Sequence, residues 1–170
     1  MGRAWRGHDP SWAFAPLSGE GARLTGGRFN RRGVPALYLA LDLSTAIAEC
    51  SQGFGRRLPP LTLCEYDVDC DDLADLTSEA DRAAHGISLD DLTGGWRLEL
   101  ARSETPASWQ AVDALIAAGF AGVIVPSFAV AAPQGGRNLV LWRWADDAHK
   151  VTVYDPGARL PRDRRSWPRR

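Results

Sequence analysis

The most informative stretch of the sequence interleaves glycines with arginines: Gly19-Glu20-Gly21-Ala22-Arg23-Leu24-Thr25-Gly26-Gly27-Arg28-Phe29-Asn30-Arg31-Arg32-Gly33. Glycine lets the backbone approach a ligand closely, and arginine offers a planar guanidinium group that holds phosphate through paired hydrogen bonds. The stretch therefore indicates a phosphate or pyrophosphate site, with a flexible surface loop as the alternative. It is not a Walker A loop, because no Gly-Lys-Ser/Thr follows, and it lacks the strand-loop-helix order of a Rossmann fingerprint.

Apolar runs after this stretch predict the strands of one folded domain. The clearest strand covers residues 37–41, directly after the turn-forming Gly33-Val34-Pro35, and contains Tyr38. Further strands are predicted at residues 61–68, 122–125, 139–144 and 151–154. The 170 residues and the 45% hydrophobic content are sufficient for one domain with one core, and no repeat or linker divides the chain.

A helix is predicted after the 37–41 strand, with Asp42 or Ser44 as N-cap and Gly53 near its end. Its apolar stripe is spaced i, i+3, i+4, i+7 and i+11 and consists of Leu43, Ala46, Ile47, Cys50 and Phe54. Glu49 lies roughly 115° from the centre of this stripe, given about 100° of rotation per residue. We therefore expect Glu49 at the border between core and solvent, as a cleft-lining acid or as an ordinary surface residue.

A second helix is predicted from about Pro106 to Ala118. Thr105 is its expected N-cap, Pro106 its first residue and Gly119 its C-terminal cap. Its buried face is expected to contain Trp109, Val112 and Leu115 or Ile116.

Polar residues also stand at the ends of two predicted strands. Ser127 follows an apolar strand, and Asn138 leads into the next one. Ser127 has no Gly-x-Ser-x-Gly elbow, so a serine nucleophile is not indicated; its hydroxyl either binds a ligand or caps a turn. Tyr38 likewise is either a core residue or an aromatic surface for a ligand ring.

Metal sites, disulfides and membrane segments are not predicted. No HExxH motif or paired metal spacing is formed by the three histidines, His8, His85 and His149. Reduced thiols are the simplest interpretation of the three cysteines, which form no CxxC pair: Cys50, Cys64 and Cys70. The first residues lack the apolar run of a signal peptide, and no run of about 18 apolar residues occurs, so we expect a cytoplasmic protein.

The net charge of −1 hides an uneven distribution. From Arg159 onward, six arginines face one aspartate, whereas the body of the chain is mildly acidic. We expect residues 159–170 to form a solvated basic tail. Binding of nucleic acid is not predicted, because no basic stripe or reading motif accompanies this tail.

The order of these motifs resembles the RES domain. The resemblance rests on Gly21-Ala22-Arg23-x-x-Gly26-Gly27-Arg28-Phe29-Asn30-x-x-Gly33, then Leu37-Tyr38-Leu39-Ala40, Ala46-x-Ala48-Glu49 and Pro126-Ser127. The Arg, Glu and Ser that give the family its name fall on Arg28, Glu49 and Ser127. The position after Arg28 is often Trp in the family and is Phe29 here. The resemblance defines residues 1–158 as the RES domain and leaves 159–170 as the tail.

The resemblance implies a fold and an activity. It implies a single α+β domain similar to the ADP-ribosyltransferases of the diphtheria-toxin kind, with antiparallel or mixed sheets and short helices. RES proteins are toxins of type II toxin-antitoxin pairs that consume NAD+ as substrate, without a metal, and an Xre-type antitoxin blocks their cleft. The catalytic residues implied are Glu49, Arg28 and Tyr38. The NAD+-binding residues implied are Arg6, Gly27, Arg28, Asn30, Tyr38, Ser127 and Asn138.

Members of the family differ in the molecule that accepts ADP-ribose. The opening segment Gly7-His8-Asp9-Pro10 through Ser18-Gly19-Glu20-Gly21-Ala22 is more similar to the ParT-like branch, which implies transfer to a protein. Hydrolysis or phosphorolysis of NAD+ is the alternative. The alternative function of a different class is a non-enzymatic module that binds nucleotides or RNA through its arginines.

Overall fold

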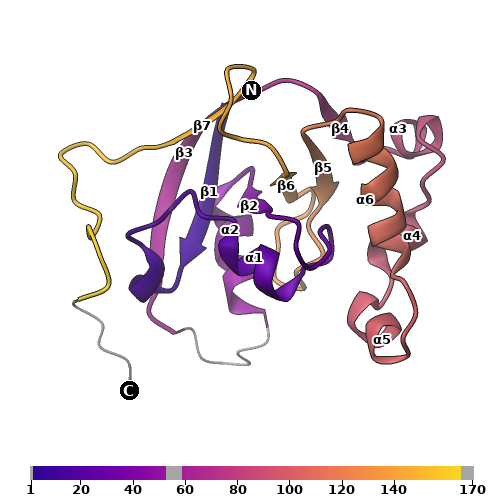
Figure 1. Ribbon diagram of the computed structural model, residues 1–170, viewed down its shortest axis with the longest axis horizontal. Helices are drawn as coiled ribbons and strands as arrows, with labels where there is room; N and C mark the ends of the chain where they lie inside the picture. Colours follow the sequence, from indigo (N-terminus) through magenta and orange to yellow (C-terminus); the bar gives the residue numbers. More distant parts are fainter. Residues whose placement is uncertain (1, 53–58, 166–170) are drawn as a thin grey trace.

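The computed structural model of the protein describes residues 2–52 and 59–165. Within these residues seven strands form one sheet in the order β4-β5-β6-β2-β1-β3-β7, with short helices on its faces (Figure 1). The pair β4–β5 is parallel and the other neighbouring pairs are antiparallel. The predicted fold class, a single α+β domain with a mixed sheet and short helices, is therefore confirmed.

The strands are β1 Gly2–His8, β2 Leu37–Ala40, β3 Thr62–Cys70, β4 Leu73–Asp75, β5 Gly122–Pro126, β6 Arg137–Leu141 and β7 His149–Val153. The helices are the 3-10 turn η1 Pro10–Trp12 and α1 Glu20–Thr25, α2 Leu43–Ser51, α3 Glu79–Ala84, α4 Leu89–Thr93, α5 Trp96–Ala101 and α6 Ala107–Ala117. All five strands predicted from apolar runs are present. The predicted 139–144 strand is β6, which begins at Arg137 and ends at Leu141.

The sheet consists of two well-paired halves that meet at a narrow seam. β1 pairs with β3 along its whole length, from Gly2 to His8. On its other side β1 pairs with β2 through one residue pair, Trp5 with Ala40. Beyond Trp5 the two strands separate, so Arg6 and Gly7 lie at an opening in the sheet.

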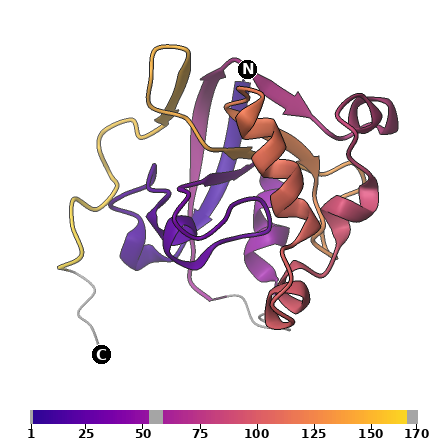
Figure 2. The same cartoon turned by 45° about the vertical axis from the view of Figure 1, so that its right-hand side comes forward.

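Each face of the sheet contributes to its own buried cluster. On β6, Val140 packs in one cluster while its neighbours Leu139 and Leu141 pack in the other, as the alternation of side chains along a strand requires. Helices α4 and α6 cover the first cluster through Leu92 and Val112. Figure 2 brings α6 to the front of this face.

The predicted apolar stripe of α2 is wrong at Leu43 and Ile47 and correct at Ala46, and the helix and its cap are correct. Asp42 is the N-cap, and its side chain accepts a hydrogen bond from the Thr45 N–H at 2.8 Å. Leu43 and Ile47 are exposed, and the buried residues are Thr45, Ala46 and Ala48. The reason is close packing, because α2 lies against β1 and β2 and only small side chains fit between them. Gly53 and Phe54, the predicted end of the helix, lie outside the described residues.

The start of α6 also differs from its prediction. Pro106, rather than Thr105, is the N-cap residue, and no side chain caps the helix. The buried face contains Trp109, Val112 and Leu115, whereas Ile116 is exposed.

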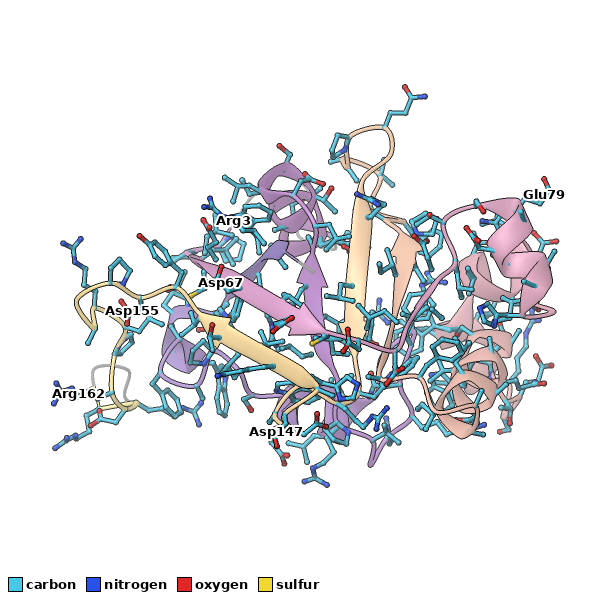
Figure 3. All side chains as sticks on the ribbon, turned by 90° about the horizontal axis from the view of Figure 1, so that it is seen from above. Arg3, Asp67, Glu79, Asp147, Asp155 and Arg162 are labelled. Atoms are coloured by element: carbon cyan, nitrogen blue, oxygen red, sulfur yellow. The ribbon has the colours of Figure 1, made fainter. Side chains whose placement is uncertain are left out.

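The described part of the basic tail is not simply solvated, because the Arg164 guanidinium group stacks 3.5 Å from the Trp12 ring centre. Figure 3 shows how the chain leaves the end of β7 near Asp155 and runs on to Arg162 in this tail.

Candidate active site

The structure brings Glu49, Ser127 and Asn138 together from three separate elements. Glu49 Oε1 accepts hydrogen bonds from the Ser127 hydroxyl at 2.6 Å and from the Asn138 amide at 2.5 Å. Glu49 Oε2 accepts one from Gln52, whose side chain is exposed. One carboxylate oxygen is thus held by Ser127 after β5 and Asn138 on β6, and among the described residues the other accepts a bond from the exposed Gln52 alone.

Helix α2 places Glu49 beside the seam for a local reason. The Asp42 carboxylate binds both the backbone N–H and the hydroxyl of Thr45, which fixes the first turn. Thr45 is completely buried, and a Cβ at Gly136 would lie 2.5 Å from its hydroxyl, so the loop before β6 packs directly on the helix. One turn later, Glu49 therefore projects toward Asn138 at the start of β6.

Tyr38 is held at the centre of the site by the glycine-arginine stretch. Its hydroxyl donates to Asn30 Oδ1 at 2.8 Å and accepts the Phe29 N–H at 3.0 Å. Burial raises the pKa of the Tyr38 phenol, so this hydroxyl stays protonated. A Cβ at Gly27 would lie 2.5 Å from the same hydroxyl, which explains the glycine there.

Asn30 is completely buried, and its side chain points into the loop rather than into a cavity. Its amide nitrogen lies within hydrogen-bond distance of three backbone carbonyls, those of Ala22, Arg31 and Val34. Its oxygen binds Tyr38. The geometry makes Asn30 a residue that positions Tyr38 and closes the loop, not one that contacts a ligand with its side chain.

The loop that carries Arg28 is anchored by hydrogen bonds to distant parts of the chain, which argues against the alternative of a flexible surface loop. Three consecutive carbonyls, those of Gly27, Arg28 and Phe29, accept hydrogen bonds at 2.7–2.9 Å. The donors come from α6 and from the end of β6: Trp109 Nε1, Ser108 Oγ and Trp142 Nε1. The preceding part of the stretch, residues 20–25, forms the short helix α1.

Arg28 is half-buried and faces Glu49 across the site. Its Nη1 donates to the carbonyls of Leu92 and Gly94 at 2.9 and 2.7 Å, and its guanidinium group lies 5.2 Å from the Phe128 ring centre. Burial lowers its pKa, an effect that the Glu49 carboxylate opposes. Among the described residues no group accepts a hydrogen bond from its other guanidinium nitrogens, which can therefore bind an anion.

Two cavities meet at Tyr38, Glu49 and Asn138, and their chemistry differs. The first, of about 180 Å³, is mainly apolar and lies at the seam between β1 and β2; it is lined by those three residues and by Trp5, Arg6, Gly7, Leu39, Ala40, Ala46 and Cys50. The second, of about 190 Å³, is more polar and is lined by the same three and by Arg28, Phe29, Gln52, Trp96, Arg97, Phe128 and Val140. Glu49 thus separates an apolar chamber from one that contains two arginines.

Arg6 forms the wall between the apolar cavity and a third one. Its Nη1 donates to the Ser18 carbonyl at 3.1 Å and to that of Pro16 at 3.4 Å. Burial lowers its pKa. The third cavity, of about 250 Å³, also contains Asp9, Trp12 and Glu20 in its lining.

The structure therefore gathers five of the predicted residues around Glu49 and its two cavities, with Gly27 and Asn30 behind Tyr38. Sequence reasoning missed Gly7, Trp96 and Arg97 as cavity residues. Gly7 gave no signal beyond a glycine in a strand, although its neighbour Arg6 was predicted, and Arg97 resembles any charged residue on an exposed helix. Within residues 2–52 and 59–165, no cluster of three His, Cys, Asp or Glu side chains could hold a metal ion.

Comparison with known proteins assigns the family. The model of the RES domain matches residues 3–163, and the chain belongs to this family. The match extends past residue 158, where the sequence prediction placed the end of the domain. A comparison with curated proteins gives no match.

A solved structure supports the same assignment. A chain in the crystal structure of the M. tuberculosis MbcT-MbcA toxin-antitoxin complex is 27% identical, with a TM-score of 0.62. The alignment covers 91% of the present chain and 81% of that chain. Among the described helices, none is long and apolar enough to cross a membrane.

Proposed function

We propose that the protein is the toxin of a toxin-antitoxin pair and that it binds NAD+ and breaks the nicotinamide–ribose bond. The observation that carries this proposal is the position of Glu49, whose carboxylate is fixed by Ser127 and Asn138 between an apolar cavity and an arginine-lined one. Membership of the RES family and the similarity to a toxin-antitoxin complex support it. We place its action in the cytoplasm, where NAD+ is available.

The two cavities match the two parts of NAD+ that lie on either side of the bond that breaks. Nicotinamide is a flat ring of low polarity once it leaves, and the cavity beside Tyr38 offers it apolar walls. The diphosphate carries negative charge, and Arg28 offers it a guanidinium group. The ribose then lies between the cavities, with its C1′ next to Glu49.

Glu49 acts by stabilising positive charge. As the C1′–N bond breaks, its electron pair goes to the nicotinamide nitrogen, which becomes neutral, and the ribose gains oxocarbenium character. A fixed carboxylate stabilises that charge without having to reorganise. The ribose 2′-hydroxyl displaces Gln52 from Glu49 Oε2 and donates to it, while Ser127 and Asn138 keep Oε1 in place. Arg28 fixes the orientation of the substrate.

The acceptor we propose is a side chain of another protein, which attacks C1′ and loses a proton. The third cavity supports this choice, because it is formed by the ParT-like opening segment, adjoins Arg6 and has the exposed residues Trp12 and Leu24 in its lining. Water or inorganic phosphate is the second candidate, since a small acceptor needs an open approach to C1′ but no docking surface beside the cleft. An Xre-type antitoxin that covers these cavities is the proposed partner.

The test is incubation of the purified protein with NAD+ labelled on the adenylate phosphate, with and without cell extract. Label retained on one extract protein supports protein ADP-ribosylation. Conversion to free ADP-ribose or its phosphate, without labelled protein, supports the second candidate. Intact NAD+ in every tube contradicts the proposed activity.

A further inference from the structure

Helix α5 contributes two side chains to the polar cavity that the sequence motifs did not identify. Trp96 and Arg97, its first two residues, line this cavity together with Arg28. The Arg97 guanidinium group lies 4.9 Å from the Trp96 ring centre, so the indole supports the charged group at the cavity wall. Two arginines from distant parts of the sequence thus face one cavity.

The charge of this arginine pair is not balanced by ion pairs. Among residues 2–52 and 59–165, no carboxylate forms a salt bridge with Arg28 or Arg97. Among the described residues that line the cavity, Glu49 is the sole carboxylate, and its oxygens already accept hydrogen bonds from Ser127, Asn138 and Gln52. Two guanidinium groups brought together at one cavity favour an anionic ligand with more than one charged oxygen.

The third cavity is a poor alternative for such a ligand. Its arginine, Arg6, is already bonded to the carbonyls of Pro16 and Ser18. Its lining also contains Asp9 and Glu20, which repel phosphate. Charge complementarity therefore directs a diphosphate to the cavity of Arg28 and Arg97.

We propose that Arg97 binds the diphosphate of the dinucleotide jointly with Arg28, so that α5 forms the second wall of the substrate site. This inference rests on the proposed function, because it places NAD+ across Glu49. It predicts that Arg97 contributes to affinity for the diphosphate and leaves the breaking bond unaffected. Arg97→Gln should therefore raise KM for NAD+ with little change in kcat.

Calorimetric titration with ADP and with adenosine measures this contribution without turnover. In Arg97→Gln, Kd for ADP should rise about tenfold, the effect of losing one charge-assisted hydrogen bond, and Arg97→Lys should recover part of the affinity. Kd for adenosine should not change. The matched control is Arg102→Gln at the other end of α5, an exposed arginine outside the cavity lining, which should stay within about twofold of wild type.

Equal ADP affinities in the Arg97→Gln and Arg102→Gln variants overturn this inference, even if the wild type cleaves NAD+. A wild type that binds ADP through Arg97 but leaves NAD+ intact contradicts the proposed function and supports the anion site. A wild type that binds neither ADP nor ADP-ribose contradicts both.

Discussion

The two cavities that meet at Glu49 lie side by side but are built differently. The apolar one is an opening in the sheet, formed where β1 and β2 separate after Trp5 and Ala40, and α2 covers it with small residues. The polar one lies against a loop and a short helix, and arginines line it. One carboxylate thus faces both an apolar site of the size of a ring and an anion site. Cleavage of the nicotinamide–ribose bond of NAD+ requires this arrangement, because the ribose lies between the ring and the phosphates.

The largest expected effect is at the border of the two cavities. Glu49→Gln keeps the size of the side chain and its contact with Ser127 but removes the charge that stabilises the ribose. We expect kcat/KM for NAD+ to fall by about 1000-fold. The control is Glu79→Gln on α3, which Figure 3 shows at the far end of the molecule from Arg162. Activity and thermal unfolding are measured for both; a folded, active Glu49→Gln protein would exclude Glu49 from the mechanism.

A second change tests the apolar cavity alone. Gly7→Ala places a methyl group against Cys50 Sγ at the cavity wall, whereas Gly2→Ala on the same strand meets nothing within 4 Å. We expect kcat/KM for NAD+ to fall by roughly 10- to 100-fold in Gly7→Ala. ADP binding in the polar cavity should stay near the wild-type value.

The second-site variant Cys50→Ala removes the clashing sulfur. Burial raises the pKa of the Cys50 thiol, so this substitution removes no charge at neutral pH. The double variant should therefore recover activity relative to Gly7→Ala. Parallel loss of NAD+ cleavage and ADP binding in Gly7→Ala would show that the two cavities are not separable.

A smaller effect is expected from the groups that hold Glu49. Ser127→Ala and Asn138→Ala each remove one hydrogen bond to Oε1, and each should lower kcat about tenfold. Because the two donors act on the same oxygen, the double variant should lose less than the product of the two single effects. Steady-state kinetics of the three variants measure this coupling; strictly multiplicative losses would mean that the two residues act independently.

The last prediction concerns stability rather than activity, and it tests how β1, the strand shared by the seam and the core, is held in place. The buried His8 binds the Tyr66 hydroxyl through Nε2, and Tyr66 donates to the Pro16 carbonyl. Burial, aided by the nearby Arg6, lowers the pKa of His8 to about 4. The unfolded chain therefore takes up a proton near pH 6.5, before the folded protein does, and this part of the stability is lost as the pH falls from 6.5 toward 4.

His8→Gln keeps a donor for Tyr66 and removes this titration. Between pH 7 and pH 5 the wild type should lose about 2 kcal/mol more unfolding free energy than the variant. Urea unfolding at both pH values measures the difference. Parallel pH curves for the two proteins would contradict the assigned environment of His8.

The sequence predicted the strands better than the packing that brings the site residues together. Local patterns placed Tyr38 on a strand and Glu49 on a helix flank, and the resemblance to the RES domain implied their roles in the site. The apolar stripe of α2 was wrong because the spacing of Leu43 and Ile47 gives no information about how closely the helix lies on the sheet. Their exposure depends on tertiary contacts.

The anchoring of the Arg28 loop could not be read from the sequence at all. Its carbonyls bind Ser108, Trp109 and Trp142, which lie 80 or more positions along the chain. Neither composition nor periodicity relates residues at such separations. The role of Arg97 could not be predicted either, because it depends on the packing of α5 beside the cavity that Arg28 lines.

The most direct test of the account is a crystal structure of Glu49→Gln with NAD+ bound. We expect the nicotinamide ring in the apolar cavity beside Tyr38 and Gly7, the ribose C1′ next to residue 49, and the diphosphate between Arg28 and Arg97. A diphosphate bound beside Arg6 and Trp12, or a nicotinamide ring in the arginine-lined cavity, would contradict the account.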